Sequence, residues 1–231
     1  MAEKIGDTLQ AELKLVAAKL EETIADLPQG LAHFVRSEMG EDRVLAGVVL
    51  ASAAPARESA EDESRRVALA AALELLQIAL NIHRLLLKPG QTGSIDSFLL
   101  GGTILAGDYC FSRAAVLAAQ TSHPMVVTVF AELLQEVSQA NLRRVISKDG
   151  SDHDPHSFDE REALFRSGAS AGALLAGLSE PEEKAVVAHA ECLGRLRQRD
   201  ETLTHRAKAE KTLDSMPWRQ RERWKELVVN L

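Results

Sequence analysis

The sequence has too few cysteines for a disulfide-stapled fold. Its 231 residues include two cysteines, Cys110 and Cys192, which are far apart and belong to no CxxC pair. Two isolated cysteines favour a reducing compartment and buried thiols. The opening residues, MAEKIGDTLQAELK, lack the apolar core of a signal peptide. The sequence therefore predicts a cytoplasmic protein.

The sequence also lacks an excess of positive charge. Acidic residues outnumber basic ones and the formal net charge is −7, which argues against a general nucleic-acid binder. Basic residues gather only at 195–199 and 219–225, with acidic or apolar residues between them. Both segments are interpreted as solvated helix faces.

No apolar segment is free enough of polar residues to span a membrane unaided. The most apolar stretch, residues 67–87, contains Glu74, Gln77, Asn81 and His83. This pattern predicts a helix buried inside the protein rather than a transmembrane segment.

Common catalytic signatures are missing as well. The sequence contains no GxSxG, P-loop, HExxH or dinucleotide-binding motif. The polar run at 148–156 includes Asp152, His153, Asp154 and His156, but the spacing of these four residues matches no metal site. We interpret this run as a loop without a bound metal.

What the sequence does contain is helical periodicity. Hydrophobic residues make up 45% and charged residues 26%, as in a globular domain with a substantial core. Apolar residues recur at three- and four-residue spacing from the start, at Leu9, Leu13, Val16, Leu20, Ile24 and Leu27. No alternation of period two exceeds four residues, so no sheet is expected. We predict an all-α fold, one domain spanning 1–231, with nine or ten helices around residues 67–87 and 98–119.

Local signals place the helix boundaries. Proline and glycine predict helix ends near residues 28–30, 55 and 89–90, and the long central helix is expected over 64–88. Ser157 and Glu160 form a plausible capping box for a helix that reaches about residue 178. Glu180-Pro181-Glu182 is expected to start the next helix.

Several of these segments together resemble the trans-prenyl diphosphate synthases. Residues 104–109 (ILAGDY) followed by 112–114 (SRA) resemble that family's "LAGDyLlarA" helix. Other segments resemble further helices of that family and follow one another along the chain as they do in the family. They are 74–76 (ELL) with 81–83 (NIH), 163–165 (ALF) with the small residues 168–177, Leu193-Gly194 with Gln198, and residues 207–231. The resemblance covers most of the chain and implies the large helical bundle of the isoprenoid synthases.

The residues that would hold magnesium in that family are absent. Two DDxxD motifs there face each other across a cavity and bind magnesium against an allylic diphosphate. Here the first motif reads 84–88 (RLLLK), with Arg84, Leu85 and Lys88 where aspartates are expected, and the second reads 201–205 (ETLTH), leaving Glu201 and His205. Magnesium requires hard oxygen ligands, so we expect no Mg²⁺ site and no catalytic residue in this chain.

The phosphate-binding segments are altered too. Residues 41–45 (EDRVL) stand where the family has "GKrxRP" and keep one arginine, while 88–93 (KPGQTG) replace its "RRGxP" segment. Of the acidic and basic groups left on the apolar helices, His83 and Asp108 are expected to be core residues with hydrogen-bonding partners.

Some members of that family are heteromers with one subunit that lacks the aspartate-rich motifs. The resemblance therefore implies a non-catalytic regulatory subunit of a heteromeric trans-polyprenyl diphosphate synthase, inactive alone, with Mg²⁺ held by a catalytic partner. The product could serve quinone side-chain biosynthesis, and a homodimer could form in isolation. Residues 98–119 and 126–146 are the expected interface, with Leu105, Tyr109, Phe111, Val116 and Phe130.

Two alternatives remain open at the level of sequence. One is a prenyl-chain-binding protein that needs no catalytic partner. The other is a divergent active prenyltransferase that uses residues such as Asp96, Asp108, Glu201 or His205.

Overall fold

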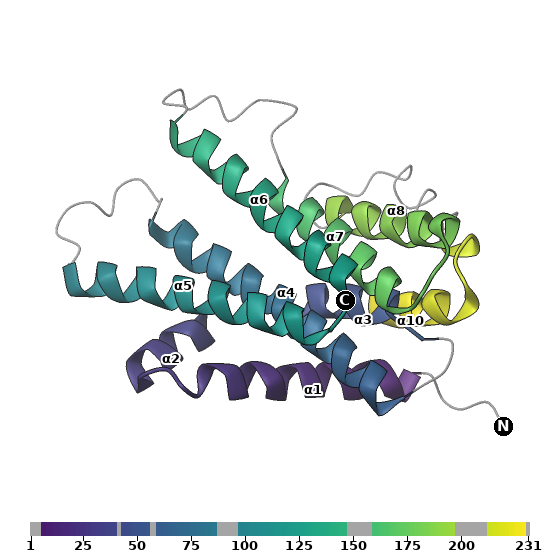
Figure 1. The fold of residues 1–231 in the computed structure, drawn as a ribbon, viewed down its shortest axis with the longest axis horizontal. Helices are drawn as coiled ribbons and strands as arrows, with labels where there is room; N and C mark the ends of the chain where they lie inside the picture. Colours follow the sequence, from purple (N-terminus) through teal and green to yellow (C-terminus); the bar gives the residue numbers. More distant parts are fainter. Residues whose placement is uncertain are drawn as a thin grey trace.

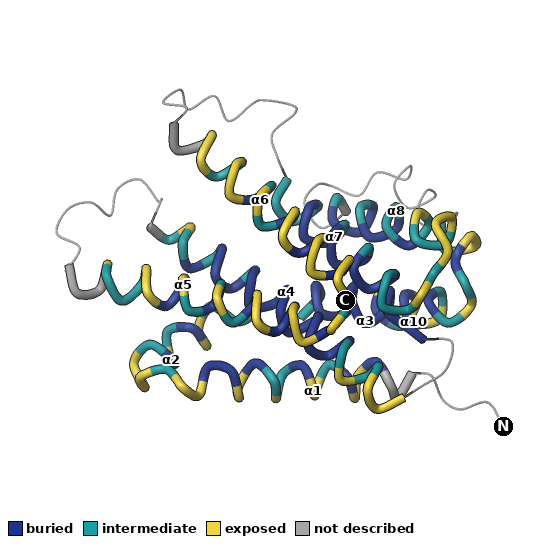
Figure 2. Tube along the Cα trace, viewed as in Figure 1, coloured by how far each residue is buried: buried dark blue, intermediate teal, exposed yellow. Residues whose placement is uncertain are grey.

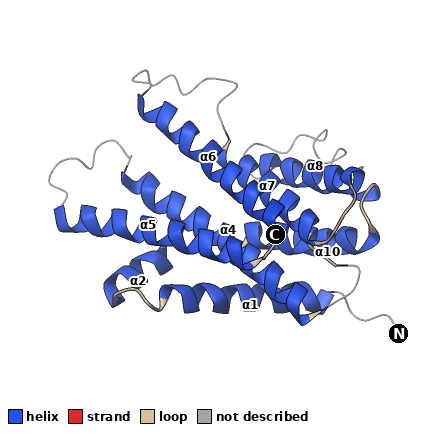
Figure 3. Cartoon of the chain, in the orientation of Figure 1, coloured by secondary structure: helices blue, strands red, loops and turns tan. Residues whose placement is uncertain are grey.

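A computed structural model describes residues 6–40, 43–55, 59–86, 97–146, 159–196 and 212–229. Within these ranges the chain forms helices and turns without a strand (Figure 3), as predicted. The helices are α1 Gly6–Ile24, α2 Gln29–Ser37, α3 Val44–Ser52, α4 Ala60–Leu86, α5 Ser97–Gln120, α6 Pro124–Ile146, α7 Glu160–Leu175, α8 Glu180–Leu196 and α10 Trp218–Val229.

Helix α4 is the centre of the bundle. It packs along α5 over most of its length and also contacts α1, α3 and α7 (Figure 1). Nearly every residue from Val67 to Ile82 is buried, which confirms the predicted core helix (Figure 2). By length and composition alone this helix could cross a membrane, but 83% of its most apolar window is buried inside the protein. That burial is typical of a core helix.

Short polar side chains set where two helices begin. Helix α4 starts at Ala60 rather than residue 64, because Ser59 accepts a hydrogen bond from the Asp62 amide (3.1 Å) and donates one to the Asp62 carboxylate (2.6 Å). Helix α7 is capped by Asp159, which accepts from the Glu162 amide at 3.1 Å. The predicted cap Ser157 lies outside the described residues, and its role is taken by Asp159.

Small residues let α3 and α7 approach closely. A Cβ atom at Gly172 would stand 2.8 Å from the carbonyl oxygen of Val49 and 2.9 Å from Cβ of Ser52. All of α3 is buried, between α7, α4 and α10. The small-residue run of the seventh helix therefore serves backbone packing.

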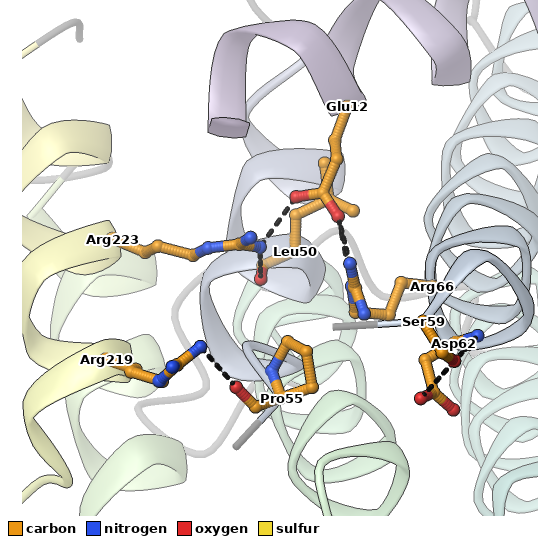
Figure 4. A network of polar contacts seen from close by, with 8 residues as sticks. All are labelled: Glu12, Leu50, Pro55, Ser59, Asp62, Arg66, Arg219 and Arg223. Atoms are coloured by element: carbon orange, nitrogen blue, oxygen red, sulfur yellow. Dashed lines mark hydrogen bonds and ion pairs between the residues drawn. The ribbon is translucent and has the colours of Figure 1, made fainter. Parts of the chain in front are cut away.

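The last helix is fixed to the first by a buried ion-pair network (Figure 4). Glu12 of α1 accepts hydrogen bonds from Arg66 of α4 at 2.6 and 3.0 Å, and from Arg223 of α10 at 2.6 Å. Arg223 also donates to the carbonyl of Leu50 at 3.1 Å. All three charged side chains are buried. The interpretation of residues 219–225 as a solvated face is thus wrong for Arg223, because its charge is matched by a distant carboxylate.

The two cysteines are buried thiols that form no disulfide, as predicted. Burial among apolar side chains raises the pKa of the Cys110 thiol to about 12. A thiol held neutral in this way is a poor nucleophile, so Cys110 serves as a core residue.

Candidate functional site

The candidate site lies where α4 ends, at the position of the expected first aspartate-rich motif. Arg84 is exposed there, and its guanidinium forms an ion pair with the carboxylate of Glu160, the first residue of α7. Leu85 beside it is half-buried, and Lys88 lies outside the described residues. A cation therefore occupies the place where the family carries carboxylates.

A second ion pair joins α7 to the end of α8. Arg195, in the last turn of α8, donates to the carboxylate of Glu162. This hydrogen bond and the positive charge hold the pKa of Glu162 below its usual value. Glu201 and His205 follow α8 but lie outside the described residues. The first turn of α7 thus bridges the ends of the two helices from which metal ligands would be expected.

The donor set at the end of α4 does not fit magnesium. The carboxylate of Glu160, which could serve as a hard ligand, is neutralised by Arg84. Within the described ranges, no group of three or more histidine, cysteine or acidic side chains could hold a metal ion.

His83 connects this end of α4 to α5. Its Nε2 lies 3.4 Å from Oδ1 of Asp108, and its ring centre is 5.2 Å from that of Phe111. A Cβ atom on Gly107 would overlap the imidazole, so glycine there makes room for it. His83 is half-buried with a partner, close to expectation, but the prediction of a buried Asp108 is wrong. Its side chain is 63% exposed because α5 leaves one face uncovered.

The arginine kept from the family's phosphate-binding segment acts electrostatically on a buried carboxylate. Arg43 precedes α3 in a left-handed conformation with φ of 34°. Glu74 of α4 accepts a hydrogen bond from the Ala46 amide in the first turn of α3, at 2.8 Å. Burial raises the pKa of Glu74, with the hydrogen bond and Arg43 acting in the opposite direction. The Glu74 carboxylate therefore accepts a hydrogen bond from one of the backbone N–H groups that have no partner within the first turn of α3.

Helices α5 and α6 present an open apolar face. Most of the exposed large apolar side chains in the described part of the chain lie on these two helices, namely Leu100, Ile104, Leu105, Val116, Met125, Val127 and Leu142. Leu105, at 64% exposed, and Val116, at 45%, are among the predicted interface residues. Figure 2 shows the exposed segments recurring along both helices.

The other predicted interface residues face inward to different degrees. Tyr109 is half-buried, and its hydroxyl donates to the carbonyl of Thr23 at 2.5 Å. Phe111 is half-buried against His83, and Phe130 is 4% exposed and belongs to the core. Phe130 therefore does not contribute to the open face. Met125, Val127 and Leu142 are exposed as well and were not predicted, because they share no single stripe of α6 that a helical spacing could reveal.

The fold is that of the prenyl diphosphate synthases. The chain is similar to a decaprenyl diphosphate synthase from Rhodobacter capsulatus (TM-score 0.66, 20% identity, 83% of this chain and 62% of that one). It is also similar to a geranylgeranyl pyrophosphate synthase from Lactobacillus brevis (TM-score 0.74, 14% identity, 96% of each chain). A geranyl diphosphate synthase small subunit from Antirrhinum majus matches over 99% of this chain and all of its own length (TM-score 0.66, 16% identity).

Sequence comparison adds nothing to this likeness. No protein-family model matches the chain, and no curated protein matches it in sequence. The structural likeness confirms the predicted isoprenoid-synthase type of helical bundle. The chain spans less than two thirds of the decaprenyl synthase, but nearly all or all of the other two proteins.

Proposed function

We propose that this chain is a non-catalytic, regulatory subunit of a heteromeric trans-polyprenyl diphosphate synthase and acts in the cytoplasm. Its partner would be a homologue with both aspartate-rich motifs, which would hold Mg²⁺ and carry out the condensation. One of the similar structures is itself described as a small subunit of a geranyl diphosphate synthase, which supports this proposal.

The observation that carries the proposal is the Arg84–Glu160 ion pair. Condensation of allylic diphosphates requires the diphosphate to leave, and magnesium assists by neutralising its charge. A guanidinium that is paired with the carboxylate of Glu160 repels magnesium and occupies a hard ligand at the end of α4. We infer that the chain keeps the fold and has no independent catalysis.

The open face of α5 and α6 supports a partner. Leu105 and Val116 are exposed on α5, and Met125 and Leu142 on α6. Exposed apolar side chains that gather on two helices are often covered in an assembled protein, and this gathering is the basis for placing a partner here. A second subunit seated there would share the apolar face with this chain and could influence the length of the product.

Co-expression with a catalytic homologue from the same organism tests the proposal. We expect the two chains to co-elute and the product to change in length or amount relative to the catalytic chain alone. A chain that neither co-elutes nor alters the product contradicts the proposal. A prenyl alcohol that raises the melting temperature of the isolated chain, without such co-elution, would instead favour a prenyl-binding protein.

A further inference from the structure

An acidic cleft lies between α6, α7 and α8, on the side of α6 away from α5. It has a volume of about 460 Å³, within the range of small-molecule sites. Five glutamates line it against two basic side chains, Arg166 and Lys184. Its walls also include apolar side chains from both α6 and α8, namely Val129, Leu133, Val187 and Ala188.

The ion pairs inside the cleft leave part of its negative charge unmatched. Arg166 pairs with Glu136 at 2.6 Å, and Lys184 pairs with Glu180 at 2.5 Å. In the described part of the chain, Glu132 and Glu191 have no ion pair. Among the described residues, the cleft therefore has a carboxylate without an ion pair on α6 and another on α8, where Glu191 feels the charge of Arg195 one turn away.

A mostly buried serine of α7 also lines this cleft. Ser167 of α7 lines the cleft and is 8% exposed, so more than nine tenths of it is buried. Among the described residues its hydroxyl makes no hydrogen bond. A mostly buried residue whose hydroxyl has no partner in the described part of the chain can accept a hydrogen bond from a ligand in the cleft at little cost in side-chain entropy.

The spacing of the acids selects the shape of the ligand. Glu180 and Glu191 are eleven residues apart on α8, which separates them by about 16 Å along the helix. Carboxylates strung along an apolar wall match several ammonium groups joined by methylene chains, rather than one compact ion. We propose that this cleft binds alkylammonium groups, such as those of a linear polyamine. The ammonium groups would contact Glu132, Glu191 and Ser167, and the methylene chains would lie on Leu133 and Val187.

Calorimetric titration of the full chain with spermidine tests this proposal. We expect binding at one site that weakens with salt. The double variant Glu132→Gln/Glu191→Gln should bind about tenfold more weakly or worse, because charge-assisted hydrogen bonds are lost. Ser167→Ala should weaken binding without changing the salt dependence. The matched control Glu38→Gln/Glu63→Gln removes two charges outside the cleft and should leave binding unchanged.

A second titration distinguishes a free polyamine from lysine side chains of another protein. Oligolysine and its fully Nε-acetylated form serve as probes. Oligolysine binding that the cleft variant abolishes, without spermidine binding, would support the site and identify protein lysines as its source. If neither probe binds, or if the control variant weakens binding as much as the cleft variant, the proposal is overturned.

Discussion

The guanidinium of Arg84, at the end of α4, is paired with the carboxylate of Glu160, at the start of α7. The two residues are 76 positions apart in sequence, and their contact lies where the fold's catalytic members would present aspartates. Aspartates at this position would attract Mg²⁺, whereas here the positive charge of Arg84 is paired with a carboxylate of the same chain. At this position the described residues therefore form an ion pair within the chain.

Reversing the charge of Arg84 should create magnesium sensitivity. Arg84→Asp places two carboxylates opposite each other, so we expect lower stability and a melting temperature that rises with added Mg²⁺. Arg84→Ala should lose at most about 1 kcal/mol, as for other solvent-exposed pairs, and should not respond to Mg²⁺. Differential scanning fluorimetry measures both. An equal Mg²⁺ response in the unaltered chain would mean that other ligands hold the ion.

The buried Glu12 network should carry much of the chain's stability. Glu12→Gln leaves Arg66 and Arg223 buried without their counter-charge, and we expect a loss of about 3–5 kcal/mol in urea unfolding. Glu21→Gln, which breaks the exposed pair with Arg36, should cost less than about 1 kcal/mol. Equal losses in the two variants would show that burial does not set the cost.

Glu74 should make stability fall as pH rises through the mildly acidic range. The pKa of Glu74 is raised in the folded state, so the folded chain binds a proton that the unfolded chain releases near the ordinary pKa of a glutamate. Stability is then lost from that value up to the raised pKa. Glu74→Gln keeps an acceptor for the Ala46 amide and should remove this loss, leaving a chain at least as stable at neutral pH.

Glu162 provides the control of opposite sign. Its pKa is lowered by Arg195, so its contribution is present above the ordinary glutamate value and is lost as pH falls through the lowered pKa. Glu162→Gln should therefore reduce stability at neutral pH and leave it little changed in acid. Urea unfolding across this pH range compares the two variants. If the free energy of unfolding changed with pH in the same way in both variants, the opposite pKa shifts of Glu74 and Glu162 would be refuted.

Charges on the open face should prevent association without unfolding the chain. Leu105→Glu/Val116→Glu places two carboxylates where an apolar partner surface would lie, and burying them unpaired should weaken binding by at least about tenfold. Leu15→Glu/Val228→Glu changes exposed apolar residues on α1 and α10 and should bind as before. Size-exclusion co-elution with the catalytic homologue measures the difference. Equal binding by both variants would place the interface elsewhere.

Sequence periodicity predicted the helices because apolar spacing follows directly from helix geometry. The buried faces of α1 and α4 are the ones that the pattern indicated, including Val16, Leu20 and Leu76. The early start of α4 at Ala60 was missed because a single capping contact, between Ser59 and Asp62, moves the boundary. Boundaries depend on such local contacts more than on apolar spacing.

The polar contacts between distant helices could not be read from sequence. Arg223 meets Glu12 across 211 residues, and Arg195 meets Glu162 across 33. Charged residues at such separations pair in many ways, and only the packing of the helices selects one. Exposure of Asp108 was missed for a related reason, since sequence alone did not indicate which face of α5 remains open.

The most direct test of the account is a condensation assay on the purified chain alone. The chain would be supplied with isopentenyl diphosphate, an allylic diphosphate and Mg²⁺, beside a catalytic homologue assayed separately and mixed with it. We predict no elongated product from the chain alone, and a changed product length or yield in the mixture. Elongation by the isolated chain at a rate comparable to the homologue would contradict the proposed role.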